Sequence, residues 1–166
     1  MLVSGEKAND LSQARKMLEA SIKDGSALNK FKQFISNQGG DPSVADNTAL
    51  LPQANVVRTL RSPCPQLISG IDGEKVGAAA LTVKAGRLVK TDQIDHSCGF
   101  ILLAKAGDRV EKGQPIAEIY APDEFTVLQA EEQLLSAYRF GGEYEDKPML
   151  LAYVDEEGIH LDKNDH

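Results

Sequence analysis

The chain has 166 residues, 42% of them hydrophobic and 26% charged, with a formal net charge of −7 at pH 7; this length suits one domain or two small ones with a buried core. The acidic balance argues against binding nucleic acid through its phosphates, and no apolar run approaches the roughly 20 residues that a membrane span needs. Because Met1–Asp10 lacks the pattern of a secretory signal and two cysteines make no disulfide framework, we expect a cytoplasmic protein in which Cys64 and Cys98 are reduced thiols.

Two amphipathic helices are predicted at the start of the chain. Asn9 or Asp10 can cap the first helix, and Gly25 can end it, because glycine adopts the left-handed conformation without a Cβ penalty. Ser26 can cap the second helix, which ends at residues 39–42. Apolar residues recur at spacings of three and four in both helices: Leu11, Ala14, Leu18 and Ile22, then Ala27, Leu28, Phe31, Phe34 and Ile35. We interpret the pair as a helical hairpin.

The second half of the chain is predicted to mix strands and helices. Asp72 is expected to cap a small helix, and Asp123 a longer one that ends at residues 141–142. Strands are predicted at residues 55–60, 66–71, 99–105, 114–120 and 149–154. The inner face of the longer helix is predicted to be Phe125, Leu128, Leu135 and Tyr138. The fold class is therefore α+β, a helical hairpin followed by a module with a mainly antiparallel sheet.

This pattern also predicts how the chain divides. Residues 1–45 form the helical hairpin, residues 46–66 a linker rich in turn formers, and residues 67–154 the C-terminal module. Residues 155–166 are expected to be a polar, frayed tail that contains His160 and His166.

Few residue patterns could carry chemistry. A P-loop needs a Lys and a Ser or Thr after its glycines, but Gln114 follows the glycine-spaced stretch 107–113. Asp92, Asp95 and His96 are the only local cluster of potential metal ligands, and we interpret them as a turn that caps neighbouring amides. Cys98, close to His96, could be an activated thiol, but a buried cysteine is the expected state. We therefore predict no catalytic, cofactor-binding or metal-binding residue.

The stretch 107–114 reads G-D-x-V-x-x-G-Q and resembles half of a biotinyl or lipoyl carrier domain. Such a carrier needs a lysine on an exposed hairpin shortly afterwards. Residues 118–124 contain no lysine, and a helix is predicted to begin there instead. We therefore expect a structural turn without biotin or lipoate.

Several motifs, taken in order, resemble one family. Residues 27–31 and the Q-G-G-D turn at 38–41 are followed by A-G-R-x-x-K-x-D-x-I-D-x-x-x-G at 85–99 and by the turn at 107–114. In order and spacing the chain is similar to pyrimidine-nucleoside and thymidine phosphorylases, from Met1 to about Val154. Met1-Leu2-Val3 resembles a point inside a family helix, so we expect the sequence to be a fragment of a longer protein.

This resemblance implies a function for the parent protein. The family cleaves thymidine, uridine or deoxyuridine with phosphate and releases the base and a (deoxy)ribose 1-phosphate. It also implies that residues 1–45 come from the end of the catalytic α/β domain and that the C-terminal module is α/β-hammerhead-like. The family's phosphate loop, of the K-H-S-T-G-G type, and its base-binding Arg, Ser and Lys are absent here. No catalytic residue can therefore be carried over to this chain.

Two hypotheses follow. In the first, the chain is an inactive structural part of a cytoplasmic phosphorylase that binds a pyrimidine nucleoside and phosphate and forms a homo-oligomer, expected to be a homodimer. In the second, it is an independent, non-catalytic binding or regulatory module with the same fold.

Overall fold

The computed structural model describes residues 1–146 and 152–161, and the chain divides into two compact units, Met1–Pro52 and Gln53–His166. This division differs from the predicted linker over residues 46–66. The difference arises because the strand at Val56–Arg61 is paired along its whole length and so belongs to the second unit.

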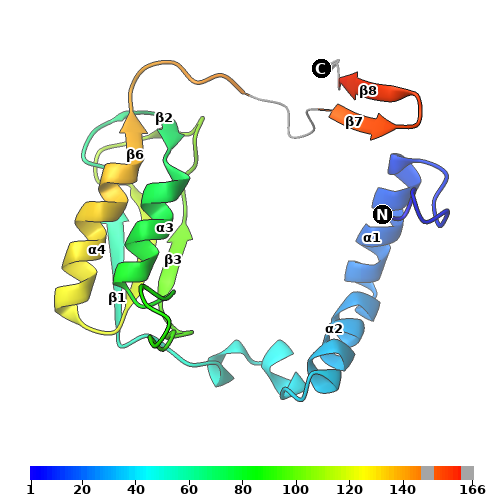
Figure 1. Cartoon of the computed structure of the whole chain (residues 1–166), viewed down its shortest axis with the longest axis horizontal. Coiled ribbons are helices and arrows are strands. Elements are labelled where there is room, and N and C mark those ends of the chain that lie inside the picture. Colours follow the sequence, from blue (N-terminus) through cyan, green and yellow to red (C-terminus); the bar gives the residue numbers. More distant parts are fainter. Residues whose placement is uncertain (147–151, 162–166) are drawn as a thin grey trace. The chain divides into compact units, whose positions relative to one another are not determined.

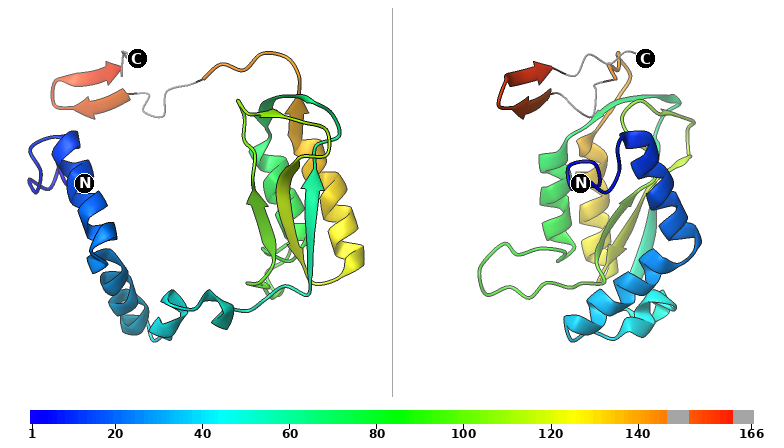
Figure 2. Two further views of the ribbon diagram at one scale, coloured as in Figure 1. Left: turned by 180° about the vertical axis from the view of Figure 1, so that it is seen from behind. Right: turned by 90° about the vertical axis from the view of Figure 1, so that its right-hand side faces the viewer.

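Two helices dominate the first unit. Helix α1 spans Leu11–Lys23 and is capped by Asp10, whose carboxylate accepts a hydrogen bond from the Gln13 amide at 2.7 Å. Helix α2 spans Ser26–Asn37 and follows Gly25, which adopts a φ of 77°. Both predicted helices are present. They run end to end with a bend at Gly25 instead of lying side by side (Figures 1 and 2), so neither helix covers the apolar face of the other.

The rest of the first unit is short. Two 3-10 helices, η1 (Pro42–Ala45) and η2 (Thr48–Leu50), follow α2. Lys32 of α2 forms an ion pair with Asp46 at 2.6 Å, which holds η1 against α2. The hydrophobic residues that this unit buries are Ala8 and Ala14. Large apolar side chains stay exposed along both long helices: Leu11, Met17, Leu18, Ile22, Leu28, Phe31 and Phe34.

The second unit contains two three-stranded antiparallel sheets. One has the order β1-β5-β3, and the other has the order β4-β2-β6. The strands are β1 (Val56–Arg61), β2 (Gln66–Ile71), β3 (Gly99–Leu102), β4 (Arg109–Val110), β5 (Pro115–Ala121) and β6 (Tyr138–Phe140). The predicted α+β class with antiparallel pairing is confirmed, whereas β4 and β6 were not predicted because runs of two or three residues show no periodicity.

The C-terminal residues differ from the prediction of a frayed tail. Strands β7 (Ala152–Asp155) and β8 (Gly158–Leu161) pair in an antiparallel hairpin. The Asp155 carboxylate accepts hydrogen bonds from the Gly158 amide and from His160, and so holds the turn closed. Of the predicted strand at residues 149–154, positions 149–151 lie outside the described residues, as does His166.

Two helices lie side by side over one face of the sheets (Figures 1 and 2). Helix α3 spans Gly73–Thr82, and Asp72 caps it by accepting from the Glu74 and Lys75 amides. Helix α4 spans Glu124–Ala137, and Asp123 caps it by accepting from the Thr126 amide at 2.7 Å. Both predicted caps are confirmed. None of the helices in the described part of the chain is long and apolar enough to cross a membrane.

The predicted inner face of α4 is correct at Leu135, which packs partly buried against the core, and at Tyr138, which is buried, but wrong at Phe125 and Leu128. Phe125 and Leu128 are 71% and 54% exposed. The side chains that α4 buries are instead Thr126, Val127, Ala130, Leu134 and Ala137. These positions also recur every three or four residues, and their alanines let the helix approach the sheet closely. The positions of the alanines therefore indicate the buried face of α4 better than the large aromatic side chain of Phe125 does.

Tyr138 joins the end of α4 to the sheet. Its side chain is buried, and its hydroxyl donates a hydrogen bond to the Ile116 carbonyl at 3.1 Å. Burial raises the pKa of Tyr138 to about 12, from an ordinary value of 10.0. The neutral phenol is therefore favoured in the folded state and the phenolate in the unfolded state.

This pKa shift predicts a loss of stability at alkaline pH. The contribution of Tyr138 to the free energy of unfolding is complete below pH 10 and is lost as the pH rises from 10 to about 12. The loss amounts to roughly 2 kcal/mol. Tyr138→Phe has no ionisable group, so its free energy of unfolding should stay flatter over this window, although it starts lower because the hydrogen bond is lost. Urea unfolding measured between pH 8 and 11.5 checks this. Parallel curves for the two proteins would contradict it.

Helix α3 ends on a residue that is unusual at its position. Lys84 adopts a φ of 63°, its amide donates to the Leu81 carbonyl, and the Ala85 amide donates to the Ala80 carbonyl. This pair of hydrogen bonds is the Schellman motif, in which glycine is the preferred left-handed residue. A lysine there incurs a steric cost of about 1–2 kcal/mol because its Cβ crowds the backbone.

Lys84→Gly should therefore stabilise the chain by about 1 kcal/mol, after the greater freedom of glycine in the unfolded chain is subtracted. Lys84→Ala is the matched control, because alanine removes the charge but keeps the Cβ and should show no comparable gain. Thermal and urea unfolding measure both variants. A Lys84→Gly protein less stable than the wild type would show that the backbone is not strained at this position.

Candidate functional site

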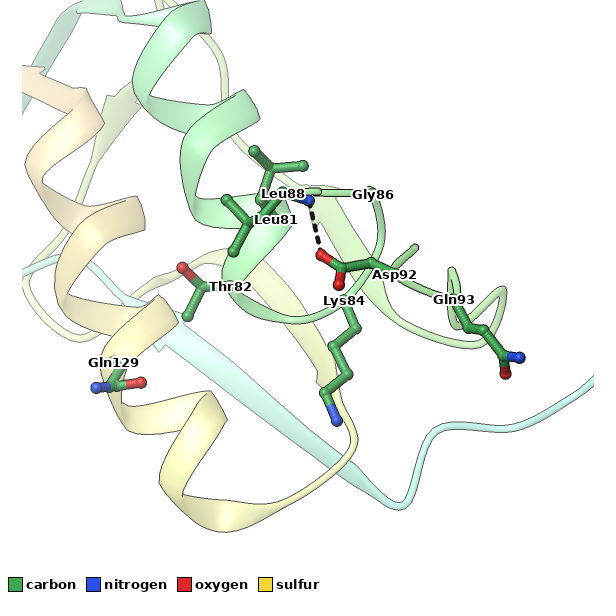
Figure 3. Close-up of a pocket in the computed structure, with 8 residues that line it drawn as sticks. All are labelled: Leu81, Thr82, Lys84, Gly86, Leu88, Asp92, Gln93 and Gln129. Atoms are coloured by element: carbon green, nitrogen blue, oxygen red, sulfur yellow. Dashed lines mark hydrogen bonds between the residues drawn. The ribbon is translucent and has the colours of Figure 1, made fainter. Parts of the chain in front are cut away.

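A cavity of about 590 Å³ lies between the end of α3, the loop that follows it and the middle of α4 (Figure 3). Its size falls within the range of small-molecule sites. The loop is closed at its base by a hydrogen bond from the Asp95 amide to the Lys84 carbonyl at 2.9 Å. The cavity is lined by Leu81, Thr82, Lys84, Gly86, Leu88, Asp92, Gln93 and Gln129.

Two features of the loop shape the wall of this cavity. A Cβ at Gly86 would lie 2.5 Å from Cδ2 of Leu81, so a side chain at residue 86 would force the Leu81 side chain to move. Within the loop, the Leu88 amide donates to the Asp92 carboxylate at 3.0 Å. Figure 3 shows the side chains of Leu81 and Leu88 near the end of α3 and the Lys84 side chain pointing away from it.

Lys84 is the one cation in the cavity lining. Within the described residues, no hydrogen bond or ion pair engages its ammonium group. The pKa of Asp123 is lowered, first by the hydrogen bonds from Thr126 and to a lesser degree by the charge of Lys84. The charge of Lys84 therefore helps to lower the pKa of Asp123, although its ammonium group forms no ion pair within the described residues.

The predicted cluster Asp92, Asp95 and His96 does cap a turn. The Asp92 carboxylate accepts from the amides of Leu88 and Val89, both at 3.0 Å. The Asp95 carboxylate accepts from the amide and hydroxyl of Ser97, and these bonds lower its pKa. No three His, Cys, Asp or Glu side chains come together as a metal site among residues 1–146 and 152–161.

Cys98 is partly buried and packs against the core. The prediction of a buried cysteine is thus met in part. Burial is the main cause that raises the pKa of its thiol, and the neighbouring Asp95 adds to it. An activated thiol needs the opposite shift, toward the thiolate. The environment of Cys98 therefore does not favour a nucleophile.

The carrier-like stretch 107–114 contains the turn before β4, β4 itself and the turn that leads from β4 to β5. Gly107 and Gly113 both adopt positive φ values, of 95° and 83°. The Ser62 amide donates to the Gln114 carbonyl, and the Gly113 amide donates to the Ser62 carbonyl, so the turn is tied to the end of β1. Strand β5 then leads directly into α4 through Asp123. These bonds give the turn a structural role, as predicted.

A second cavity, of about 430 Å³, was not predicted from the sequence. Its central feature is Arg139 of β6, which lies opposite Gly70 of β2. A Cβ at Gly70 would collide with the guanidinium group, so the present position of the Arg139 side chain depends on glycine at residue 70. Glu145 lines the same cavity, and we assign no function to it. The pairing of β2 with β6 brings Gly70 and Arg139 together.

Comparisons with known proteins place the second unit in a family. The model of the pyrimidine nucleoside phosphorylase C-terminal domain matches residues 67–141. The pyrimidine-nucleoside phosphorylase of Bacillus subtilis (strain 168) is 43% identical over 121 residues, which cover 73% of this chain and 28% of that protein. The pyrimidine-nucleoside phosphorylase of Geobacillus stearothermophilus is 39% identical over 151 residues, which cover 91% and 35%. The chain thus matches about a third of the length of these relatives.

Proposed function

Residues 67–141 belong to the family of pyrimidine nucleoside phosphorylase C-terminal domains, and from this membership we propose that the chain serves as the C-terminal, structural part of a pyrimidine-nucleoside phosphorylase. The observation that carries this proposal is the match of 91% of the chain to 35% of the length of the Geobacillus stearothermophilus relative. The parent protein would transfer the pentosyl group of a pyrimidine nucleoside to phosphate in the cytoplasm, and this chain would supply scaffold.

The residues of the described part support a scaffold role. Asp92, which lines the cavity, accepts hydrogen bonds from two backbone amides, and the thiol of Cys98 has a raised pKa. Phosphoryl and pentosyl transfers depend on positioning and on charge stabilisation by several groups at once. A single unpaired lysine does not meet this requirement.

The chain alone should therefore not phosphorolyse thymidine or uridine. The measurement is chromatographic detection of free thymine and uracil after incubation with phosphate, with the Bacillus subtilis relative as a positive control. The host must lack its own nucleoside phosphorylases. Base released above a no-protein control, and in proportion to the amount of chain, would overturn the assignment of a structural role.

The first unit supports a further part of the proposal. Its helices α1 and α2 expose a row of large apolar side chains, which includes Leu11, Ile22 and Phe34. Exposed rows of this kind usually mark an interface. We propose that residues 1–45 belong to the catalytic α/β domain of the parent protein and that other elements of that domain cover this row. In the chain by itself, a second copy would cover it and produce a homo-oligomer.

An independent binding module is the second candidate function. The cavity with its unpaired Lys84 favours it, because a scaffold needs no charged side chain in a strained backbone position. The two candidates are separated by ligand binding to the isolated chain, which a purely structural part would not show.

A further inference from the structure

Strand β3 is an edge strand that lacks the usual protection of an edge. It is the last strand in the order β1-β5-β3 (Figure 1), and within the described residues no strand pairs with its other side. The Leu103 amide donates to the Ile116 carbonyl of β5. Because bonded and non-bonded pairs alternate in an antiparallel ladder, the peptide groups of Phe100 and Leu102 face the open edge. Residues 97–104 contain neither a charged residue nor a proline, which are common protections of an exposed edge.

The side chains along this edge are apolar and only partly covered. Ile101 and Leu102 are 49% and 41% exposed. Leu102 lies opposite Ala117 of β5, and Ala117 belongs to the core that α4 helps to form. Leu102 therefore points to the face of the sheet that the helices cover. An apolar edge of this kind is a template for pairing with another strand.

The β7–β8 hairpin is a pair of strands without a larger sheet. Within the described residues its strands pair only with each other. Val154 and Ile159 lie opposite each other, and both are 74% exposed. A two-stranded hairpin by itself is at best marginally stable in water. The chain between Phe140 and Ala152 can span up to roughly 40 Å, enough to cross a domain of about 100 residues.

We propose that the β7–β8 hairpin docks on the free edge of β3 and extends the sheet to the order β1-β5-β3-β8-β7. A two-residue turn joins Asp155 to Gly158, so these two residues form a hydrogen-bonded pair. By alternation, the peptide groups of Ile159 face the outer side of β8. When Ile159 pairs antiparallel with Leu102, both side chains lie on the helix-covered face. Val154 joins them there, because it lies opposite Ile159.

Charge selects β8, and not β7, as the strand beside β3. With Ile159 opposite Leu102, the antiparallel register brings Glu156 of the hairpin turn close to Lys105, which follows β3. If β7 ran antiparallel beside β3, the acidic turn would lie at the other end of β3, near Asp95, where like charges destabilise the pairing. This inference does not depend on the proposed function, because it concerns the fold of the second unit alone.

Amide hydrogen exchange of the full chain, followed by NMR, tests the docking. The amides of Phe100 and Leu102 should be protected, although neither has a partner in β5. Val154→Asp with Ile159→Asp places carboxylates on the docking face and should speed their exchange at least about ten-fold. The Ile101 amide, which bonds to β5, should stay protected in both proteins and so show that the sheet remains folded.

Two further variants make the test specific. Phe125→Asp with Leu128→Asp adds the same charge to an exposed apolar pair of α4 and should leave the exchange at the β3 edge unchanged. Glu156→Lys should weaken the protection of that edge, and Lys105→Glu in the same chain should restore it, because the exchanged charges attract again.

Three results would overturn the proposal. Fast exchange of Phe100 and Leu102 in the wild type, with Ile101 slow, would show an open edge. Protection that survives Val154→Asp with Ile159→Asp would show that another segment covers β3. Protection that rises with protein concentration would show a second copy at the edge. Failure of Lys105→Glu to restore the protection would overturn the placement of β8 beside β3.

Discussion

Leu134→Ala is expected to lower the free energy of unfolding by about 2–5 kcal/mol, the usual range for a fully buried leucine. Leu134 lies on the inner side of α4 and is 0% exposed. Its truncation leaves a cavity between α4 and the sheet that neighbouring side chains fill only in part. Because the second unit holds nearly all of the buried core, a loss of this size is a large fraction of a typical domain stability of roughly 5–15 kcal/mol.

Leu128→Ala is the matched control. It removes the same atoms from the same helix, but Leu128 is 54% exposed, so its cost should stay within about 0.5–1 kcal/mol. Urea unfolding monitored by circular dichroism measures both variants, with the slope of the transition as a check that the unfolded states are comparable. Equal costs for the two substitutions, or a larger cost for Leu128, would show that α4 is rotated relative to the sheet.

The same helix shows what sequence patterns could and could not predict. Asp123 as its cap follows from a local rule, since a carboxylate can accept from the amide three residues later, and the structure has this bond. The buried face does not follow from local rules. Two stripes of α4 have helical spacing, and the sheet selects the one with Ala130 and Ala137, which permits a close approach. That choice depends on the partner surface.

The end of α4 shows a second limit. The pair Gly141-Gly142 suggested a helix that continues to residue 140, but the helix stops at Ala137 and Tyr138 begins a strand. The aromatic ring of Tyr138 is buried between α4 and the sheet, and its hydroxyl reaches the Ile116 carbonyl. A contact across 22 residues of chain overrides the local helical pattern.

The candidate site was predictable only in its local parts. The capping role of Asp92 and Asp95 was predicted from their place in a turn, and the hydrogen bonds agree with it. The cavity was not predicted, because Gln129 joins residues 81–93 only through the packing of α3 against α4. Lys84 carried a usable signal: a lysine stands where the end of a helix before Ala85-Gly86 would favour glycine.

Self-association through the first unit is the second large effect that we expect. Seven large apolar side chains of α1 and α2 are exposed, among them Ile22 at 74% and Phe34 at 60%. Burying the exposed half of such side chains contributes roughly 1 kcal/mol each, or on the order of 15 kcal/mol for the two faces of a symmetric dimer. If the cost of association is about 8 kcal/mol, within the usual range of roughly 4–15 kcal/mol, a dissociation constant on the order of 10 µM remains.

A charged double variant tests whether this face is the interface. Ile22→Glu with Phe34→Glu places carboxylates on the exposed row, where they need not disturb the fold because both side chains are solvent-accessible. Asn29→Glu with Gln33→Glu adds the same charge at exposed polar positions of α2 and serves as the matched control. Sedimentation velocity from about 1 to 300 µM, a range that brackets the expected constant, should show the wild type and the control associating and the first variant remaining monomeric.

The outcome separates covering by a second copy from covering within one chain. If the wild type stays monomeric throughout and its α1 and α2 amides are strongly protected from hydrogen exchange, another part of the same chain covers the row and the proposed homo-oligomer is wrong. If it stays monomeric with fast exchange, the row is uncovered, because isolated helices of 13 and 12 residues are only marginally stable in water. The expected result is that the wild type associates, and that its α1 and α2 amides exchange slowly only at high protein concentration. Only covering by a second copy makes the protection of both helices depend on concentration.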